Sequence, residues 1–407
     1  MRKSYGLLIL LNNFATGVMS PVLTLALLAH GASIQNVSLF LGIYSLTVIA
    51  AEFPSGVFAD LCGRKKAYLV SAALRGISCC ALLLSNAVPM LAAAMVLQGL
   101  GRAFSSGSID ALAMDEAVSS GGEIVKVSAQ ISVMESVGLA AGALAGGLIS
   151  GLGARYEGNL ATTLALSALV FLGTAIFVRE VLPPRAEGEA LKLKHLGVQV
   201  RESLSFAAQG GTVRMLLVFS ALTGFALISI ETYWQPALLS LSPLPAVFGA
   251  VSFFGFACVV LGSKLAERLL TRCPRGGVAA SLGLKALFGA CLGLLALPGK
   301  TLPFVGVYAL LYLFLGSGGV AESALLNQQA PPEQRASILS LFSFALQIGG
   351  LLASLCGALV SAHADFRYLW YLAGGLLLLG VAAFTLLRVV RYAKARSDAG
   401  ASGKESA

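Results

Sequence analysis

The stretch Glu52-Phe-Pro-Ser-Gly-Val-Phe-Ala-Asp60-Leu-Cys-Gly-Arg64-Lys65-Lys66 decides the fold. It is rich in charge and glycine, whereas the sequence on both sides of it is apolar. Charged residues concentrated where one long apolar run ends and the next begins are typical of a short connection between two membrane helices. We therefore predict a tight, charged loop between two spans.

The composition of the whole chain agrees with a membrane protein. Of its 407 residues, 57% are hydrophobic and only 12% are charged, whereas about a quarter of the residues of a soluble domain are charged. Too few polar groups are present to cover the surface of a water-soluble globule.

Twelve apolar runs are long enough to cross a hydrocarbon layer of about 30 Å as helices. They cover residues 5–29, 36–55, 67–86, 89–113, 124–151, 159–179, 212–239, 245–267, 276–298, 302–326, 334–361 and 367–391. Twelve spans place both termini on one side, where most of the 28 lysines and arginines also lie; Arg155, Lys300 and Arg367 lie opposite. By the positive-inside rule both termini are predicted to be cytoplasmic, in a multi-pass protein of the plasma (inner) membrane. Basic loops facing anionic lipid also explain the net charge of +9 without a nucleic acid partner.

The chain divides into two halves. Residues 1–181 and 212–392 each contain six spans, and residues 182–211 form a polar linker between them, expected on the cytoplasmic side. Within the linker, apolar residues at helical spacing from Leu193 to Leu204 predict a short amphipathic surface helix or, alternatively, a solvated linker. Residues 393–407 are expected to form a disordered cytoplasmic tail.

A weak internal repeat relates the halves. An offset of about 210 residues places Arg75 on Lys285 and Ser71 on Ser281. Two six-span halves of the same orientation are typical of transporters that work by alternating access at the interface between the halves. Glycines in the fifth and eleventh spans would let helices approach closely there: Gly138, Gly142, Gly146, Gly147, Gly349, Gly350 and Gly357.

Enzyme chemistry has no support in the sequence. The seven cysteines are scattered without metal-ligand spacing, and neither a phosphate-binding loop nor a nucleophile elbow is present. We expect no enzymatic activity, no metal and no cofactor.

The segment Gly56-x-Phe-Ala-Asp60-x-x-Gly63-Arg64-Lys65 resembles the signature loop between the second and third helices of the major facilitator superfamily. With Glu52-x-Pro54, it is similar to the variant loop of the branch that includes the clostridial tetracycline-efflux protein, among the drug/proton antiporters. Two positions depart from the family pattern: Leu61 replaces a basic residue, and Met95 replaces the arginine of drug/proton antiporters.

The resemblance implies that the loop is a conformational latch, which holds the cytoplasmic side closed when the cavity opens outward. Its members would be Gly56, Asp60, Gly63, Arg64 and Lys65, with Asp115 at the end of the fourth helix as the ion-pair partner of Arg64. The alternative is plain capping, with Asp60 favoured by the free amides at the start of the third helix.

Eight ionisable residues fall inside or at the edge of spans, where each costs about 2.5 to 3.5 kcal/mol on insertion scales and so requires a partner, a wet cavity or a function. They are Glu52, Arg75, Arg102, Asp110, Glu135, Glu231, Lys285 and Glu322. The resemblance implies that helices one, four, seven and ten line a central cavity. It therefore implies cavity positions for Arg102, Asp110, Glu231 and Glu322, together with Asn12 and Asn13 of helix one; Glu52 is a further candidate.

Arg102, Ser106 and Asp110 recur every four residues and predict one polar stripe on the fourth helix. This stripe either presents a cation and an anion to the cavity or neutralises itself internally. The resemblance implies that Arg75 and Lys285 lie toward the outside of each half, where they would neutralise acids of the loop clusters; a role in transport is the alternative.

Two further acids carry a predicted role together with an open alternative. Glu231, followed by Tyr233 and Trp234, would suit a cationic or amphipathic ligand; alternatively the aromatic residues form an interfacial belt. Glu135 lies near the middle of its span, where it would take up and release protons. Alternatively it is a buried acid bonded to a neighbour such as Gln130.

The sequence thus predicts a secondary active transporter, an all-α protein of twelve spans in two pseudo-symmetric halves, which works as a monomer. Its predicted function is proton-coupled efflux of amphipathic small molecules or drugs. The alternatives are a symporter or uniporter for a metabolite such as a sugar or organic anion, and a non-transporting membrane receptor on the same fold.

Overall fold

The computed structural model describes residues 3–106, 108–119, 124–152, 156–180, 211–272, 277–329 and 335–402. The predicted linker helix falls in 182–210 and lies outside the described residues, as do residues 403–407 of the tail. No strand occurs in the described part of the chain.

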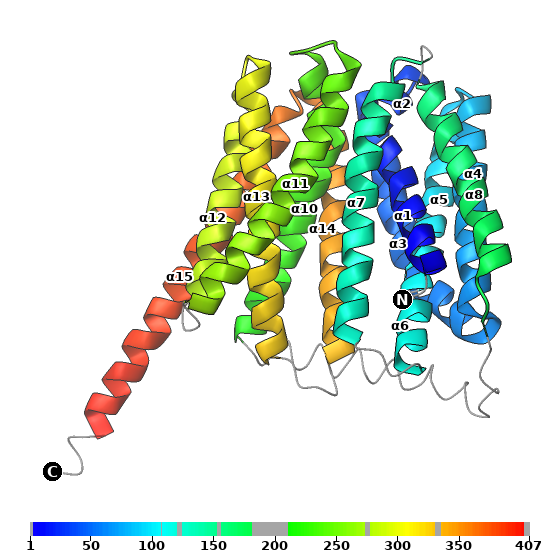
Figure 1. Cartoon of the computed structure of the whole chain (residues 1–407). Helices are drawn as coiled ribbons and strands as arrows, with labels where there is room; N and C mark the ends of the chain where they lie inside the picture. The colour runs from blue at the N-terminus through cyan, green and yellow to red at the C-terminus, as the bar shows by residue number, and fades with distance from the viewer. Residues whose placement is uncertain are drawn as a thin grey trace.

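The helices form two bundles that lie side by side (Figure 1). The N-terminal half contains α1 (Lys3–Met19), α2 (Leu23–Ala29), α3 (Ile34–Cys62), α4 (Arg64–Leu84), α5 (Val88–Ser105), α6 (Ile109–Ser119), α7 (Ile124–Ile149) and α8 (Glu157–Phe177). The C-terminal half contains α10 (Gly211–Leu239), α11 (Pro245–Arg272), α12 (Gly277–Leu295), α13 (Thr301–Gln329), α14 (Arg335–His363) and α15 (Arg367–Ser402). The predicted all-α membrane fold with two six-span halves is confirmed.

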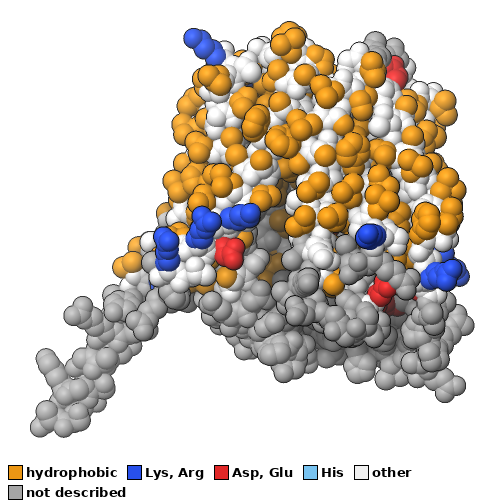
Figure 2. All heavy atoms as spheres, viewed as in Figure 1, with side chains coloured by type: hydrophobic (Ala, Val, Ile, Leu, Met, Phe, Trp, Pro, Cys, Tyr) orange, Lys and Arg blue, Asp and Glu red, His pale blue; other side chains and the backbone are white. Residues whose placement is uncertain are grey.

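The surface is that of a protein that crosses a membrane. Among the described residues, 11 helices are long and apolar enough to cross, or up to 12 if the bent pair α1 and α2 is one span. Large apolar side chains such as Leu148, Leu302 and Leu379 are more than 60% exposed. Figure 2 shows hydrophobic side chains over most of the height of the molecule, with the visible lysines and arginines mostly toward one end. Such a surface is stable only against lipid.

Two spans predicted as continuous helices are broken. The first bends by 50° between α1 and α2, where Pro21 lacks an amide hydrogen and interrupts the helical hydrogen bonds. The fourth breaks between α5 and α6, where Ser106 has the non-helical angles φ −59° and ψ 125°. The predicted continuous stripe through Arg102, Ser106 and Asp110 is therefore wrong, because Ser106 lies at the break.

The C-terminal helix is longer than expected. α15 continues to Ser402, so residues 393–402 are helical rather than disordered. This extension contains four alanines, and alanine has the highest helix propensity.

We name the two ends of the bundle by what they carry. The linker end is where α8 ends and α10 begins, and the α2 end is opposite (Figure 1). The halves pack through α3 against α14 and α7 against α11. At the second contact, a Cβ added to Gly147 would lie 2.5 Å from the Cα of Gly249. Only glycine permits this approach, which agrees with the predicted role of the small residues.

Candidate functional site

A cavity of about 450 Å³ lies between the halves, within the usual range for small-ligand sites. Every span of the N-terminal half contributes to its lining, whereas the C-terminal half contributes three residues of α10: Ile228, Glu231 and Gln235. Of the predicted cavity residues, the lining contains Asn12, Asn13, Arg102, Asp110, Glu135 and Glu231, and it also contains Arg75. The cavity thus carries charges of both signs, set among apolar side chains that provide the larger part of its surface.

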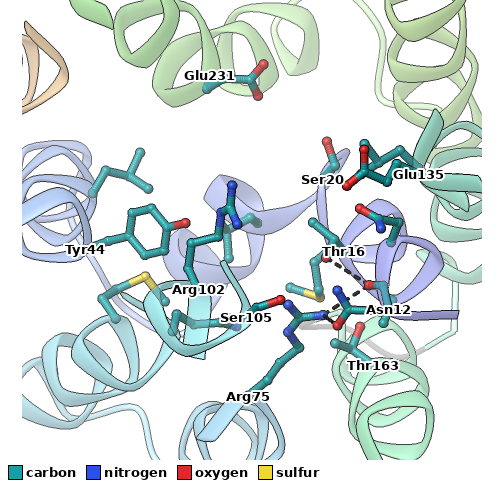
Figure 3. Close-up of a pocket in the computed structure, with 18 of the residues that line it drawn as sticks. Asn12, Thr16, Ser20, Tyr44, Arg75, Arg102, Ser105, Glu135, Thr163 and Glu231 are labelled. Carbon is teal, nitrogen blue, oxygen red and sulfur yellow. Dashed lines mark hydrogen bonds between the residues drawn. The ribbon is translucent and has the colours of Figure 1, made fainter. Parts of the chain in front are cut away.

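Arg75 is in the cavity lining and not toward the outside of its half, so that expectation was wrong. From α4 its Nη1 donates to the backbone carbonyl of Asn12 at 3.1 Å and to Asn12 Oδ1 at 2.8 Å. Figure 3 shows both side chains beside the cavity. An arginine side chain is long enough to carry its charge away from an apolar helix face into a polar space. Asn13 turns back on its own helix and donates to the carbonyl of Ile9 at 2.9 Å.

Arg102, Asp110 and Glu135 form the charged part of the lining on α5, α6 and α7. Both acids interact electrostatically with Arg102. None of the three makes an ion pair within 4.0 Å with another described residue. The predicted internal ion pair of Arg102 and Asp110 is therefore not formed, and the guanidinium is free for a ligand.

Glu231 enters the cavity from α10, on the side opposite Arg102 (Figure 3). Its carboxylate accepts a hydrogen bond from the hydroxyl of Tyr312. The ring centroids of Tyr312 and Tyr308 are 4.5 Å apart, and those of Tyr308 and Trp234 are 5.3 Å apart. An aromatic cluster in the C-terminal half thus positions this acid, and no lysine, arginine or histidine among the described residues pairs with it.

Tyr233 and Trp234 do not line the cavity, which corrects the prediction for Tyr233. They are 1% and 0% exposed, so an interfacial belt is also excluded for Trp234. Tyr233 stacks on Phe366 at 5.0 Å between centroids. A helix turns by 100° per residue, so these neighbours of Glu231 point into the core of the half instead.

Glu322 and Lys285 form a separate buried cluster, which corrects the expected cavity position of Glu322 and the expected outward position of Lys285. Lys285 Nζ lies 3.1 Å from Glu322 Oε1 and donates to Thr223 Oγ1 at 2.5 Å. Lys285 is only 2% exposed, and neither charged residue lines the cavity. The two opposite charges pair with each other inside the C-terminal half, as buried charges require. Glu52 is exposed on α3 and is also absent from the cavity lining.

The loop between α3 and α4 contains one predicted contact and one unexpected cap. Arg64 makes an ion pair with Asp115, as predicted. The amides of Arg64 and Lys65 donate to the two carboxylate oxygens of Glu180 at 2.8 and 2.9 Å. Glu180, and not Asp60, therefore caps the N-terminus of α4.

The remaining members of the loop are exposed or allow the backbone to reverse direction. Asp60 is exposed and makes no hydrogen bond or ion pair with a described residue. Gly63, with φ 103°, allows the reversal from α3 into α4. Around Gly56 no atom lies within 4 Å of an added Cβ, so in this conformation nothing requires glycine there.

Hydrogen bonds join the halves at the α2 end, and we call this contact the seam. Its members are Ser20, Thr24, Leu25, Gln35 and Ser38 of the N-terminal half with Tyr233, Gln235 and Ser361 of the C-terminal half. No side-chain hydrogen bond joins the halves at the linker end in the described ranges. The structure is therefore closed at the α2 end.

Gln235 holds the broken first span. Its Oε1 accepts from the amides of Thr24 at 3.0 Å and Leu25 at 3.4 Å, and its Nε2 donates to the carbonyl of Ser20 at 2.9 Å. These backbone groups lack helical partners because the break lies between α1 and α2. The sequence reasoning missed Gln235, although its spacing of four residues from Glu231 places both on one face of a helix.

Comparison with known proteins supports the architecture. The sequence model described as Major Facilitator Superfamily matches residues 5–320 and 274–406. The nucleoside transporter NupG has a TM-score of 0.77 at 14% identity, covering 94% of this chain and 98% of that one. A POT family transporter in complex with 5-aminolevulinic acid has a TM-score of 0.73 at 12% identity, covering 94% and 95%.

A bacterial homologue of the human lysosomal transporter Spinster, in an inward-facing and unoccupied conformation, has a TM-score of 0.70 at 16% identity, covering 94% and 95%. At these identities the likeness concerns the fold alone. No curated protein sequence matches the chain.

Proposed function

The chain belongs to the major facilitator superfamily, and on this premise we propose that it is a secondary transporter that carries a small polar solute through the central cavity by alternating access. The observation that carries the proposal is the cavity itself, which lies between the halves and is lined by five ionisable side chains. Membership of this family indicates a transporter and not an enzyme.

The charged groups of the lining favour a solute with polar or charged groups over an apolar drug. Besides the charges, the lining contains Asn12, Asn13, Gln98 and Gln235. An apolar drug would remove the water from Gln98 and from the charged side chains that lack an ion-pair partner, at a cost for each unsatisfied group. One of the similar structures is named a nucleoside transporter, and a nucleoside is a polar metabolite, which agrees with the metabolite alternative.

We propose proton exchange at the cavity acids as the source of coupling. Asp110 and Glu135 share the surroundings of Arg102, so a proton bound by either acid changes the charge that a solute meets there. Glu231 lies apart on the other half and is the third candidate.

The seam and the loop cluster would close opposite ends in turn. In the proposed orientation both termini and the linker end are cytoplasmic, in the inner membrane, so the structure corresponds to the state that faces inward. Arg64 and Asp115 would help to close the linker end in the other state, with Gly56, Asp60 and Lys65 contributing only then. The cavity is complete within one chain, which supports a functional monomer.

Flux measurements in liposomes test the proposal. Purified protein is reconstituted, a proton gradient is imposed, and the movement of labelled nucleosides, peptides, sugars, amino acids, tetracycline and an amphipathic dye is followed. We expect gradient-dependent flux of a polar solute that is lost in Glu135→Gln with normal insertion. Flux of the dye or tetracycline alone would favour drug efflux, and no flux of any compound would favour a receptor.

A further inference from the structure

All cations of the cavity lie in one half, which also carries the acids Asp110 and Glu135, whereas the other half contributes only an acid. Arg75 and Arg102, the two cations in the lining, both belong to the N-terminal half. Across the cavity, Glu231 is the one ionisable lining residue of the C-terminal half (Figure 3). A ligand that touches both halves therefore meets two guanidinium groups, with two acids in the surroundings of Arg102, on one side and the carboxylate of Glu231 alone on the other.

The guanidinium side is suited to an anion. Arg75 and Arg102 carry like charge and both line the cavity. Arg75 uses a single nitrogen, Nη1, for its two bonds to Asn12, and a guanidinium has five N–H donors in a planar fork. Arg102 makes no hydrogen bond with a described residue. A carboxylate between them would offset the like charges and accept hydrogen bonds from these free donors.

The opposite side is suited to a cation. Tyr312 occupies one acceptor position of Glu231, whereas a carboxylate offers about four. No cationic side chain among the described residues is within ion-pair distance of it. A carboxylate removed from bulk water is stabilised by a paired positive charge, and an ammonium group of a bound solute would supply one.

We infer that the solute is a small zwitterion, whose carboxylate binds between Arg75 and Arg102 and whose ammonium group binds Glu231. This inference rests on the proposed transport function and names its substrate class. A simple anion would leave Glu231 uncompensated, and a simple cation at Glu231 would leave the free donors of Arg75 and Arg102 without an acceptor. A zwitterion also bridges the halves, so its binding favours the conformation in which both charged sides face one cavity.

A series of ω-amino acids, from glycine to 6-aminohexanoate, probes this arrangement because the members differ only in the separation of the two charges. Each is added to the purified full-length protein as the free zwitterion, the N-acetyl derivative and the carboxamide, and affinity is measured by thermal stabilisation. We expect one chain length to bind best, and either blocking group to weaken that member at least 10-fold.

Variants assign each end of the ligand. In Glu231→Gln the free amine and the N-acetyl derivative should bind equally, while the preference for the carboxylate remains. In Arg102→Gln the carboxylate and the carboxamide should bind equally, while the preference for the free amine over the N-acetyl derivative remains. The exposed residues Glu267 and Arg388 provide matched controls, since Glu267→Gln and Arg388→Gln should retain both preferences.

Three outcomes would overturn the inference: no ω-amino acid binds, blocked derivatives bind as well as zwitterions, or the two cavity variants lose affinity without a change in selectivity. Gradient-driven flux of an uncharged polar solute, with no binding of zwitterions, would refute a zwitterionic substrate but would still support the transport function. Absence of flux for every compound refutes the transport function itself.

Discussion

Replacing Gln235 by leucine should open the α2 end of the transporter. The change removes the hydrogen bonds to Thr24, Leu25 and Ser20 at the break of the first span. A buried backbone group without a partner costs about 1 to 3 kcal/mol. Thr24 is only 2% exposed, so its amide would be one of the groups left without a partner.

The effect can be estimated from the two shorter bonds, at 3.0 and 2.9 Å. Cavity water can reach part of this site, so we take the lower limit for each, about 1 kcal/mol. Losing about 2 kcal/mol from the closed state alone shifts the ratio of closed to open molecules about 30-fold.

Spin labels report this shift directly. Cysteines at the exposed positions Asn86 and Lys300 lie in loops at the α2 end of opposite halves, in a background that lacks the native cysteines. Pulsed electron resonance then measures the distance between the labels. In Gln235→Leu we expect the long-distance population to increase at the expense of the short one.

Two companion variants make the measurement decisive. Gln98→Leu is the same substitution in the same cavity, but Gln98 makes no hydrogen bond with a described residue, and its distances should match wild type. Gln235→Glu retains the acceptor and loses the donor to Ser20, so an intermediate shift is expected. A folded Gln235→Leu protein with the wild-type distribution would refute the reasoning.

Three further predictions concern packing, a buried charge and a cap. Gly147→Val should prevent closure against Gly249, because an added Cβ lies 2.5 Å from its Cα, and should lower transport at least about 10-fold in the liposome assay. Lys285→Met should leave Glu322 uncompensated and cost about 3 to 5 kcal/mol, seen as a lower thermal unfolding temperature. Glu180→Ala should cost about 1 kcal/mol of capping energy, so the first two amides of α4 should exchange hydrogen about 5-fold faster.

Each of these has its own control. Gly151→Val meets no atom within 4 Å and should transport normally. Lys285→Met combined with Glu322→Leu should recover most of the lost stability, because an apolar pair replaces the ion pair; equal instability of single and double variants would contradict the account. Asp60→Ala should leave amide exchange at the start of α4 unchanged, and a change as large as that of Glu180→Ala would restore Asp60 as the cap.

The sequence by itself determined the fold, because the bilayer imposes a simple rule. Backbone groups cannot remain unpaired in hydrocarbon, so each long apolar run must be a helix, and the run lengths predicted the spans. The partner of Arg64 could also be predicted, since Asp115 ends a span on the same side of the membrane. The breaks in the first and fourth spans were missed, although Pro21 was a local signal for the first.

Only the tertiary structure decided where each charged side chain inside the membrane points. Arg75 and Lys285 are equivalent in the repeat, yet the first reaches the cavity and the second pairs with Glu322. Apolar spans have weak amphipathic patterns because lipid and protein core are equally apolar, so sequence periodicity does not indicate which face is inward. The loop from Glu52 to Lys66 therefore identified the kind of transporter, whereas the charges that select a solute became visible only when the two halves were placed around one cavity.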